Sequence, residues 1–452
     1  MPARPPIRTP LAALVGLCVA YVLVVERDAR VAEVPVKVLL CVLAGAAWLL
    51  WRGRHLRPRA FSLGVPVLAL GIVLPVAWAA VALWTRSRGS DVARVELRDL
   101  AEEASRFGYV LLYFPLADVL GHGTGRRQLW WVAPLLVLAV LTWVFWWQLG
   151  HDNPSWANTD HHLVFNGIFG IVGDSLRAFL GQHALWPLLV AWLLAGILLG
   201  RGVVPRAAAG VLALSALWPA HSRGVWIGTG IAVAVVMVAR HPRTLAIGRR
   251  VALPGAAVAL VLVVVVSAIV LGGDVGRGSA LDDYSSSTRF DQAPELWAAF
   301  KGAPVLGSGL GARLADGYVR STSAPWSFEL TYLQLLVQVG VVGLVLVLLP
   351  VAAMLVRLVR EPLGAGHDAT AMGAVGLAGA LGLYEAAATN PFLVTSYGMG
   401  GLAVALALAG PVRTWADEGA EAPDPPRWAW AIAWAVLALC VAGAAYEALA
   451  PR

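Results

Sequence analysis

The chain alternates long apolar runs with short polar or basic turns. Many of the runs approach the roughly 20 residues that a helix needs to cross a bilayer. Because backbone polar groups in lipid must be hydrogen-bonded within a helix or a closed barrel, such runs predict an all-α, polytopic transmembrane helical bundle of about 12–13 spans. The predicted spans lie at about 9–25, 34–51, 61–84, 108–120, 129–149, 183–200, 204–219, 225–239, 251–272, 331–356, 371–389, 394–410 and 428–446.

The composition agrees with this pattern. Hydrophobic residues make up 59% of the chain and charged residues 13%, and the mean hydropathy is +0.72. These values exclude a soluble globular protein of this length. The three cysteines, Cys18, Cys41 and Cys440, all fall inside predicted spans, so they indicate neither a disulfide framework nor a cysteine-based metal site.

The net charge of +7 comes from clustered arginines, whose positions indicate membrane orientation rather than nucleic-acid binding. By the positive-inside rule the basic turns face the cytoplasm, so the N-terminus is predicted to be cytoplasmic. The alternate turns then face outward, at about 26–33, 85–107, 150–182, 220–224, 273–330 and 390–393. The arginines of the basic turns are Arg4, Arg8, Arg52, Arg54, Arg57, Arg59, Arg126, Arg127, Arg201, Arg206, Arg240, Arg243, Arg249, Arg250, Arg357 and Arg360.

An arginine also occurs on the predicted outer side, in the sequence His221-Ser222-Arg223-Gly224 at the start of the eighth span. Such an arginine often only reaches toward lipid headgroups. Several features favour an anion-binding site instead. Arg223 opposes the positive-inside bias, Ser222 and Gly224 are small enough for a ligand to approach the backbone, and helix N-terminal amides attract anions. His221 adds a second donor.

The longest polar stretch is the predicted outer loop 273–330. Helical spacing of four apolar residues within it predicts an amphipathic helix that lies in the membrane interface. These residues are Phe290, Ala293, Trp297 and Phe300. Arg289 is predicted to open this helix, where its guanidinium and the N-terminal amides can share one anion.

A glycine-rich turn follows at 303–313. Gly307, Gly309 and Gly311 allow the chain to run close to a ligand. By themselves these glycines are weak evidence for phosphate binding, because glycine-rich loops are common and no P-loop lysine follows this one.

Glu329 lies at the predicted outer surface, directly before the next span. A carboxylate in this position can accept a proton from an attacking hydroxyl. The alternative is an interfacial ion pair with Arg313 or Arg320, and both interpretations stay open.

Other polar residues carry weaker signals. Glu385, toward the outer end of the eleventh span, needs a partner or water because charge is costly in a membrane, and it serves either helix packing or a binding cavity. The segment 85–107 is predicted to be an outward amphipathic helix with a solvated charged face. Asp160, His161 and His162 are predicted to form a plain solvated loop, and no metal or cofactor is expected.

The order and sidedness of these motifs resemble the O-antigen ligase and polymerase family. The shared features are an outward Ser-Arg-Gly that opens a span, a basic inner turn, an outer loop with a Pro-x-Leu-Gly-x-Gly turn, and a Tyr-Leu-Gln-Leu-Leu segment before a Gly-x-x-Gly span. The resemblance covers about residues 205–360, and the first 200 residues only by span layout. It implies an enzyme that moves sugar chains from polyprenyl diphosphate carriers on the outer face of the bacterial cytoplasmic membrane.

The resemblance also implies roles for single residues. The matching positions are Ser222, Arg223 and Gly224 for the family's arginine motif, Arg289 for its loop arginine, and Gly307, Gly309 and Gly311 for its glycine turn. One departure concerns the base. Ligases usually have His-Asn-x-Tyr-Leu where this chain has Glu329-Leu330-Thr331-Tyr332-Leu333, so glutamate replaces the histidine that activates the acceptor hydroxyl. This change favours a polysaccharide polymerase over a ligase acting on lipid A–core.

The chemistry of such a transfer suits these side chains. A guanidinium stays charged and binds phosphate oxygens in pairs, so Arg223 and Arg289 can stabilise a departing diphosphate without a metal. The expected partners are a polyprenyl diphosphate-linked glycan donor, a glycan or lipid-linked glycan acceptor, the lipid bilayer and other polysaccharide assembly proteins. A transporter or flippase of a lipid-linked precursor is the alternative, and it requires charges along a path open to both faces.

The predicted organisation has three parts. Residues 1–200 form N-terminal transmembrane helices, and residues 201–410 form a ligase- or polymerase-like core that includes the outer loop 273–330. Residues 411–452 form a cytoplasmic connector and a last transmembrane helix.

Overall fold

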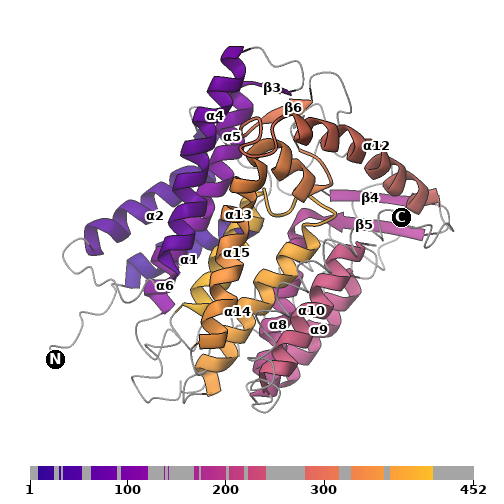
Figure 1. Cartoon of the computed structure of the whole chain (residues 1–452). Coiled ribbons are helices and arrows are strands. Elements are labelled where there is room, and N and C mark those ends of the chain that lie inside the picture. The colour runs from indigo at the N-terminus through magenta and orange to yellow at the C-terminus, as the bar shows by residue number, and fades with distance from the viewer. Residues whose placement is uncertain are drawn as a thin grey trace.

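The fold is known from a computed structural model, drawn in Figure 1. The described residues are 9–24, 30–31, 34–52, 63–88, 93–120, 137, 141, 167–172, 175–199, 203–217, 222–240, 280–314, 327–360 and 367–410. The predicted spans 251–272 and 428–446, most of span 129–149, the connector 411–427, and the residues Asp160, His161, His162, His221 and Arg320 lie outside them.

Apolar helices dominate the described part of the chain. Two of them, Gly64–Arg88 and Thr331–Arg357, are long and apolar enough to cross a membrane. Six shorter apolar helices accompany them: Leu11–Val24, Val36–Trp51, Gln182–Leu198, Arg223–Ala239, Ala371–Ala386 and Ser396–Ala409. Helices therefore occur where apolar runs were predicted to span the membrane, as far as these residues are described.

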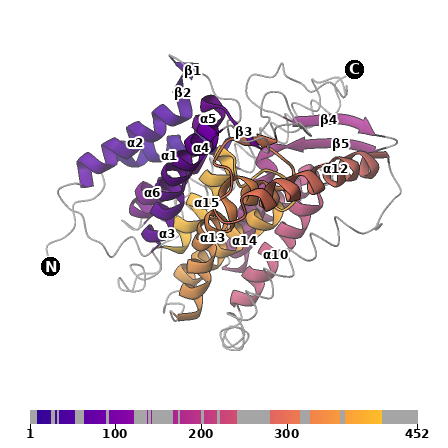
Figure 2. The ribbon, with the colours of Figure 1, turned by 45° about the horizontal axis from the view of Figure 1, so that its top comes forward.

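The N-terminal helices form one side of the bundle in both views (Figures 1 and 2). A single long helix consists of α3, a π-helical segment η2 and α4, and α5 leads through the 3-10 helix η3 into α6. The elements are α1 (Thr9–Val24), α2 (Val36–Arg52), α3 (Gly64–Leu68), η2 (Ala69–Val73), α4 (Leu74–Arg88), α5 (Leu97–Gly108), η3 (Tyr109–Leu112) and α6 (Tyr113–Leu120).

The later helices form the centre and the other side of the bundle (Figures 1 and 2). The innermost helix is α15, whose residues from Tyr397 to Ala409 are all buried. Its alanines, glycines and leucines allow neighbouring helices to pack closely around it. The elements are η4 (Gly181–Leu185), α8 (Trp186–Leu198), α9 (Val203–Leu217), α10 (Arg223–Arg240), α12 (Ala280–Gly302), α13 (Thr331–Arg360), α14 (His367–Ala386) and α15 (Ser396–Ala409).

Within the described residues, three small antiparallel sheets of two strands each add to the helices, so the all-α prediction was incomplete in this respect. The pairs are β1 (Arg30–Val31) with β2 (Val34–Pro35), β3 (Ala93–Val95) with β6 (Ala312–Leu314), and β4 (Gly167–Val172) with β5 (Ser175–Leu180).

The β3–β6 pair joins two turns that were predicted to lie on the same side of the membrane. Arg94 of the segment 85–107 pairs with Arg313 of the loop 273–330. Both views place α12, β3–β6 and β4–β5 at one end of the bundle (Figures 1 and 2). The helix α12, the strand β6 and the turn between them carry the candidate residues Arg289, Gly307, Gly309, Gly311 and Arg313.

Candidate functional site

The ends of three helices meet at what we call the junction: the start of α10, the start of α13 and the end of α14. The Tyr332 hydroxyl donates to the Tyr384 carbonyl oxygen at 2.6 Å. The Thr331 hydroxyl donates to the Asn390 carbonyl oxygen, also at 2.6 Å. These bonds fix the first residues of α13 against the last turn of α14 and the connector that follows it.

Arg223 is the first residue of α10, as predicted, and its side chain is exposed. The preceding carbonyl, of Ser222, accepts the first helical bond from the Trp226 N–H at 3.1 Å. Gly224 permits close contact with α14, because a Cβ there would lie 2.7 Å from Thr389 Oγ1 and 3.2 Å from the Ala386 carbonyl oxygen. Helix packing thus explains why residue 224 is small.

Two buried polar atoms at the junction have no hydrogen-bond partner among the described residues. They are Ser222 Oγ and Glu385 Oε2, and each side chain is only 6% exposed. The contact of Gly224 with Ala386 places the first turn of α10, which follows Ser222, beside the last turn of α14, which carries Glu385. Because an unpaired buried polar group costs free energy, these atoms are suited to bind a polar ligand.

Glu329 lies in the segment that leads into α13, and it is half-buried. Its backbone N–H donates to Gln292 Oε1 of α12 at 3.0 Å. Arg313, the predicted ion-pair partner, instead lies against α5. Its guanidinium pairs with Glu96 and lies 3.7 Å from a carboxylate oxygen of Asp99.

The helix α12 differs from its prediction in two ways. It begins at Ala280 and not at Arg289, so the prediction that Arg289 opens this helix was wrong. The predicted apolar face also divides between two environments. Ala293 and Phe300 pack against a cluster at the start of α13, whereas Trp297 is 49% exposed. The cluster consists of Leu296, Ala299, Phe328, Leu330 and Val337.

The three glycines of the turn have left-handed backbone conformations, with φ of +70° at Gly307, +99° at Gly309 and +73° at Gly311. Each approaches backbone of another element so closely that a Cβ would clash. The nearest atoms would be backbone of Gln338 for Gly307 at 2.5 Å, of Ala82 for Gly309 at 2.2 Å and of Leu100 for Gly311 at 2.6 Å. The turn therefore requires glycine for its own packing.

The glycine turn also completes a break in α13. Gly340 has a φ of +62° inside this helix, which frees the backbone groups around it. The Val341 N–H then donates to the Pro304 carbonyl at 3.0 Å, and the Gly309 N–H donates to the Gln338 carbonyl at 2.8 Å. The turn and α13 thus form one hydrogen-bonded unit.

The carboxylate of Glu103 in α5 is buried, which was not predicted from the sequence. Glu103 is fully buried and Asp99 is 4% exposed, so the predicted solvated face was wrong at these positions. Glu103 accepts hydrogen bonds from the Gly311 N–H, Gln334 Nε2 and Gln338 Nε2. A sequence signal existed, because Asp99 and Glu103 share a helical face with the buried Phe107.

Burial raises the pKa of Glu103 to about 7. The hydrogen bonds from Gly311, Gln334 and Gln338 and the positive charge of Arg106 act in the opposite direction, so the loss of solvation outweighs them.

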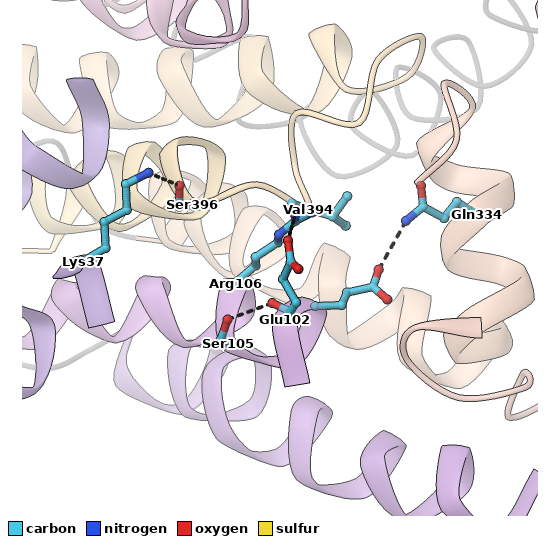
Figure 3. Close-up of polar contacts among 8 residues, drawn as sticks. Lys37, Glu102, Ser105, Arg106, Gln334, Val394 and Ser396 are labelled. Carbon is cyan, nitrogen blue, oxygen red and sulfur yellow. Dashed lines mark hydrogen bonds and ion pairs between the residues drawn. The ribbon is translucent and has the colours of Figure 1, made fainter. Parts of the chain in front are cut away.

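Two cations contact the end of the connector between α14 and α15 and the first residue of α15 (Figure 3). Lys37 of α2 donates to Ser396 Oγ at 2.9 Å. Arg106 of α5 donates to the Val394 carbonyl oxygen at 3.3 Å and pairs with Glu102 at 2.8 Å. The N-terminal helices thereby support the connector that follows the junction.

The apolar helices of the described residues are consistent with an all-α membrane protein. Residues 208–348 match the family described as O-Antigen ligase. This match confirms the resemblance to the O-antigen ligase and polymerase family, and it includes Arg223, Arg289 and Glu329 but not Glu103 or Glu385. No curated protein and no solved structure matches the chain.

Proposed function

We propose that this protein is a glycosyltransferase of surface-polysaccharide assembly. It transfers or polymerises glycan units from a polyprenyl diphosphate carrier on the outer face of the cytoplasmic membrane. The observation that carries the proposal is the O-Antigen ligase match, because the matched segment holds both predicted diphosphate arginines and the predicted base.

The donor diphosphate is bound by Arg223 and Arg289. During transfer the bond between the anomeric carbon and the diphosphate oxygen breaks, and the negative charge on the diphosphate increases. Arg223 stabilises this negative charge from the first turn of α10, where helical amides add to the positive potential. The guanidinium fork binds two oxygens at once, so a metal is not required.

The acceptor is a glycan hydroxyl that attacks the anomeric carbon. Its proton passes to the Glu329 carboxylate, which replaces the histidine of the ligases and favours a polymerase. The unpartnered Ser222 Oγ and Glu385 Oε2 support an acceptor-binding role, because a sugar hydroxyl can donate to the carboxylate and exchange a hydrogen bond with the serine. We also assign a substrate-binding role to His221, Arg313, Arg320 and the three glycines of the turn, as the sequence predicts.

Alanine variants of the two arginines test the proposal in cells. Arg223→Ala and Arg289→Ala are expected to abolish the polysaccharide while the protein still accumulates in the membrane. Lysine is expected to restore little activity, because a point charge does not reproduce the fork. Arg86→Ala is the matched control, since Arg86 is an exposed arginine at a helix end and has no assigned role.

The position of the accumulated donor separates the two classes of function. A blocked transferase leaves the lipid-linked glycan on the outer face, whereas a blocked flippase leaves it on the inner face. Normal polysaccharide in both alanine variants refutes the diphosphate role and makes headgroup contact the better explanation of Arg223.

A further inference from the structure

Three hydrogen-bond donors converge on the buried carboxylate of Glu103. They come from the glycine turn and from α13: the Gly311 N–H, Gln338 Nε2 at 3.0 Å and Gln334 Nε2 at 3.2 Å. An ionised carboxylate only accepts hydrogen bonds, so it can satisfy all three donors together. An amide or a protonated acid carries a donor of its own and cannot.

This arrangement fixes which way the Gln334 amide points. Because its nitrogen faces Glu103, its oxygen faces the opposite way and accepts the Phe328 N–H at 2.9 Å. The residue after Phe328 is Glu329, whose N–H donates to Gln292 Oε1. Two consecutive backbone amides, directly before α13, are therefore held by glutamine side chains.

We propose that Glu103 is a positioning residue for glycan transfer: it orients the Gln334 amide, which in turn fixes the backbone that carries Glu329. The inference rests on the proposed function, in which Glu329 is the base. In this scheme Glu103 contacts neither the glycan donor nor the glycan acceptor. It also lies outside the segment that matches the O-Antigen ligase family.

The charges around Glu103 favour a response to pH. The glycine turn and α13 contribute neutral donors, Arg106 contributes a positive charge from α5, and Arg313 of β6 is paired with Glu96 and Asp99. When Glu103 is protonated, its O–H faces the N–H groups of Gly311, Gln334 and Gln338, and at least one of these hydrogen bonds is lost. Since burial raises the pKa of Glu103 to about 7, turnover is expected to rise with pH through this region.

The test is Glu103→Gln, with Glu102→Gln as the matched control. Glu102 is the adjacent residue, is partly exposed and pairs with Arg106 on the other side of the network. Glu103→Gln is expected to lower kcat about tenfold to a hundredfold with little change in the donor KM, because a misplaced base slows chemistry rather than binding. The rise in kcat near pH 7 is expected to disappear in Glu103→Gln and to persist in Glu102→Gln.

A double variant, Glu103→Gln with Gln334→Glu, keeps the test decisive if the single variant folds poorly. The exchanged pair again joins an amide donor to a carboxylate, and the new carboxylate can still accept the Phe328 N–H. We expect it to restore a large part of kcat. A folded double variant without activity, or a Glu103→Gln protein with normal kcat and an unchanged pH profile, overturns the positioning role.

Hydrogen–deuterium exchange separates this inference from the proposed function. Amides of residues 327–333 are expected to exchange faster in Glu103→Gln than in Glu102→Gln, whether or not glycan transfer is detected. Unchanged exchange refutes the positioning role. Faster exchange in a protein whose wild type transfers no glycan preserves the contact network but refutes the function assigned to it.

Discussion

The close packing of α10 on α14 predicts different effects for two glycine substitutions on the same helix. A Cβ at Gly228 would lie 2.4 Å from the Gly382 carbonyl oxygen, whereas a Cβ at Gly230 meets nothing within 4 Å. An ordinary contact begins at 3.4 Å, so α10 must move by about 1 Å to accommodate Gly228→Ala. Such overpacking costs about 1–3 kcal/mol. The gain in helix propensity, about 1 kcal/mol, applies to both variants and cancels in the comparison.

The comparison is made on purified protein in detergent. We expect Gly228→Ala to be less stable than Gly230→Ala by about 1–3 kcal/mol in the free energy of unfolding. We also expect it to lose transfer activity about a hundredfold, because the shift moves Arg223 relative to Glu385. Equal stability and equal activity of the two variants would show that the α10–α14 contact does not set the geometry of the junction.

Three further predictions concern the turn, the buried carboxylate and the orientation. Gly309→Ala is expected to be less stable than Gly108→Ala by about 2–5 kcal/mol in thermal unfolding, because it adds backbone strain and overpacking. Equal stability of the two variants would favour a ligand role for the turn. Because the folded pKa of Glu103, about 7, exceeds its ordinary 4.5, unfolding free energy should fall by about 3 kcal/mol between pH 4.5 and 7, and Glu103→Gln should remove this slope. In a cysteine-free background, Ser286→Cys should react with an impermeant thiol reagent in spheroplasts and Arg249→Cys should not; the reverse refutes the orientation.

The helices of this fold could be predicted from the sequence because their signal is local. Apolar runs of membrane-spanning length fix their approximate limits, and the polar sequence before α10 predicts its start at Arg223. The β3–β6 pair joins segments more than 200 residues apart, and no local pattern predicts such a pairing. The charged residues of α5 predicted a solvated face, but the carboxylate of Glu103 is buried. Its hydrogen-bond donors come from α13 and the glycine turn, which are distant in the sequence.

The candidate site was predictable in its residue types and less so in its contacts. Arg223 and Glu385 lie on adjoining helix ends, and a shared outer site there stays a prediction. The glycines of the turn were predicted to let a ligand approach the chain. In the fold they have positive φ values and contact the backbone of other elements, and these distant contacts could not be read from the local sequence. The start of α12 was placed too late because hydroxyl residues before Arg289 looked like a helix cap, yet they continue the helix.

The central claim is that this chain transfers glycan from a polyprenyl diphosphate with Arg223 at the diphosphate. The most direct measurement uses purified protein in liposomes, a metal chelator, and the lipid-linked glycan that accumulates in cells lacking this protein. Wild type is expected to lengthen the glycan or move it to an acceptor and to release polyprenyl diphosphate, while Arg223→Ala leaves the donor intact. Release of polyprenyl diphosphate by Arg223→Ala at the wild-type rate, or no transfer by wild type, would contradict this claim.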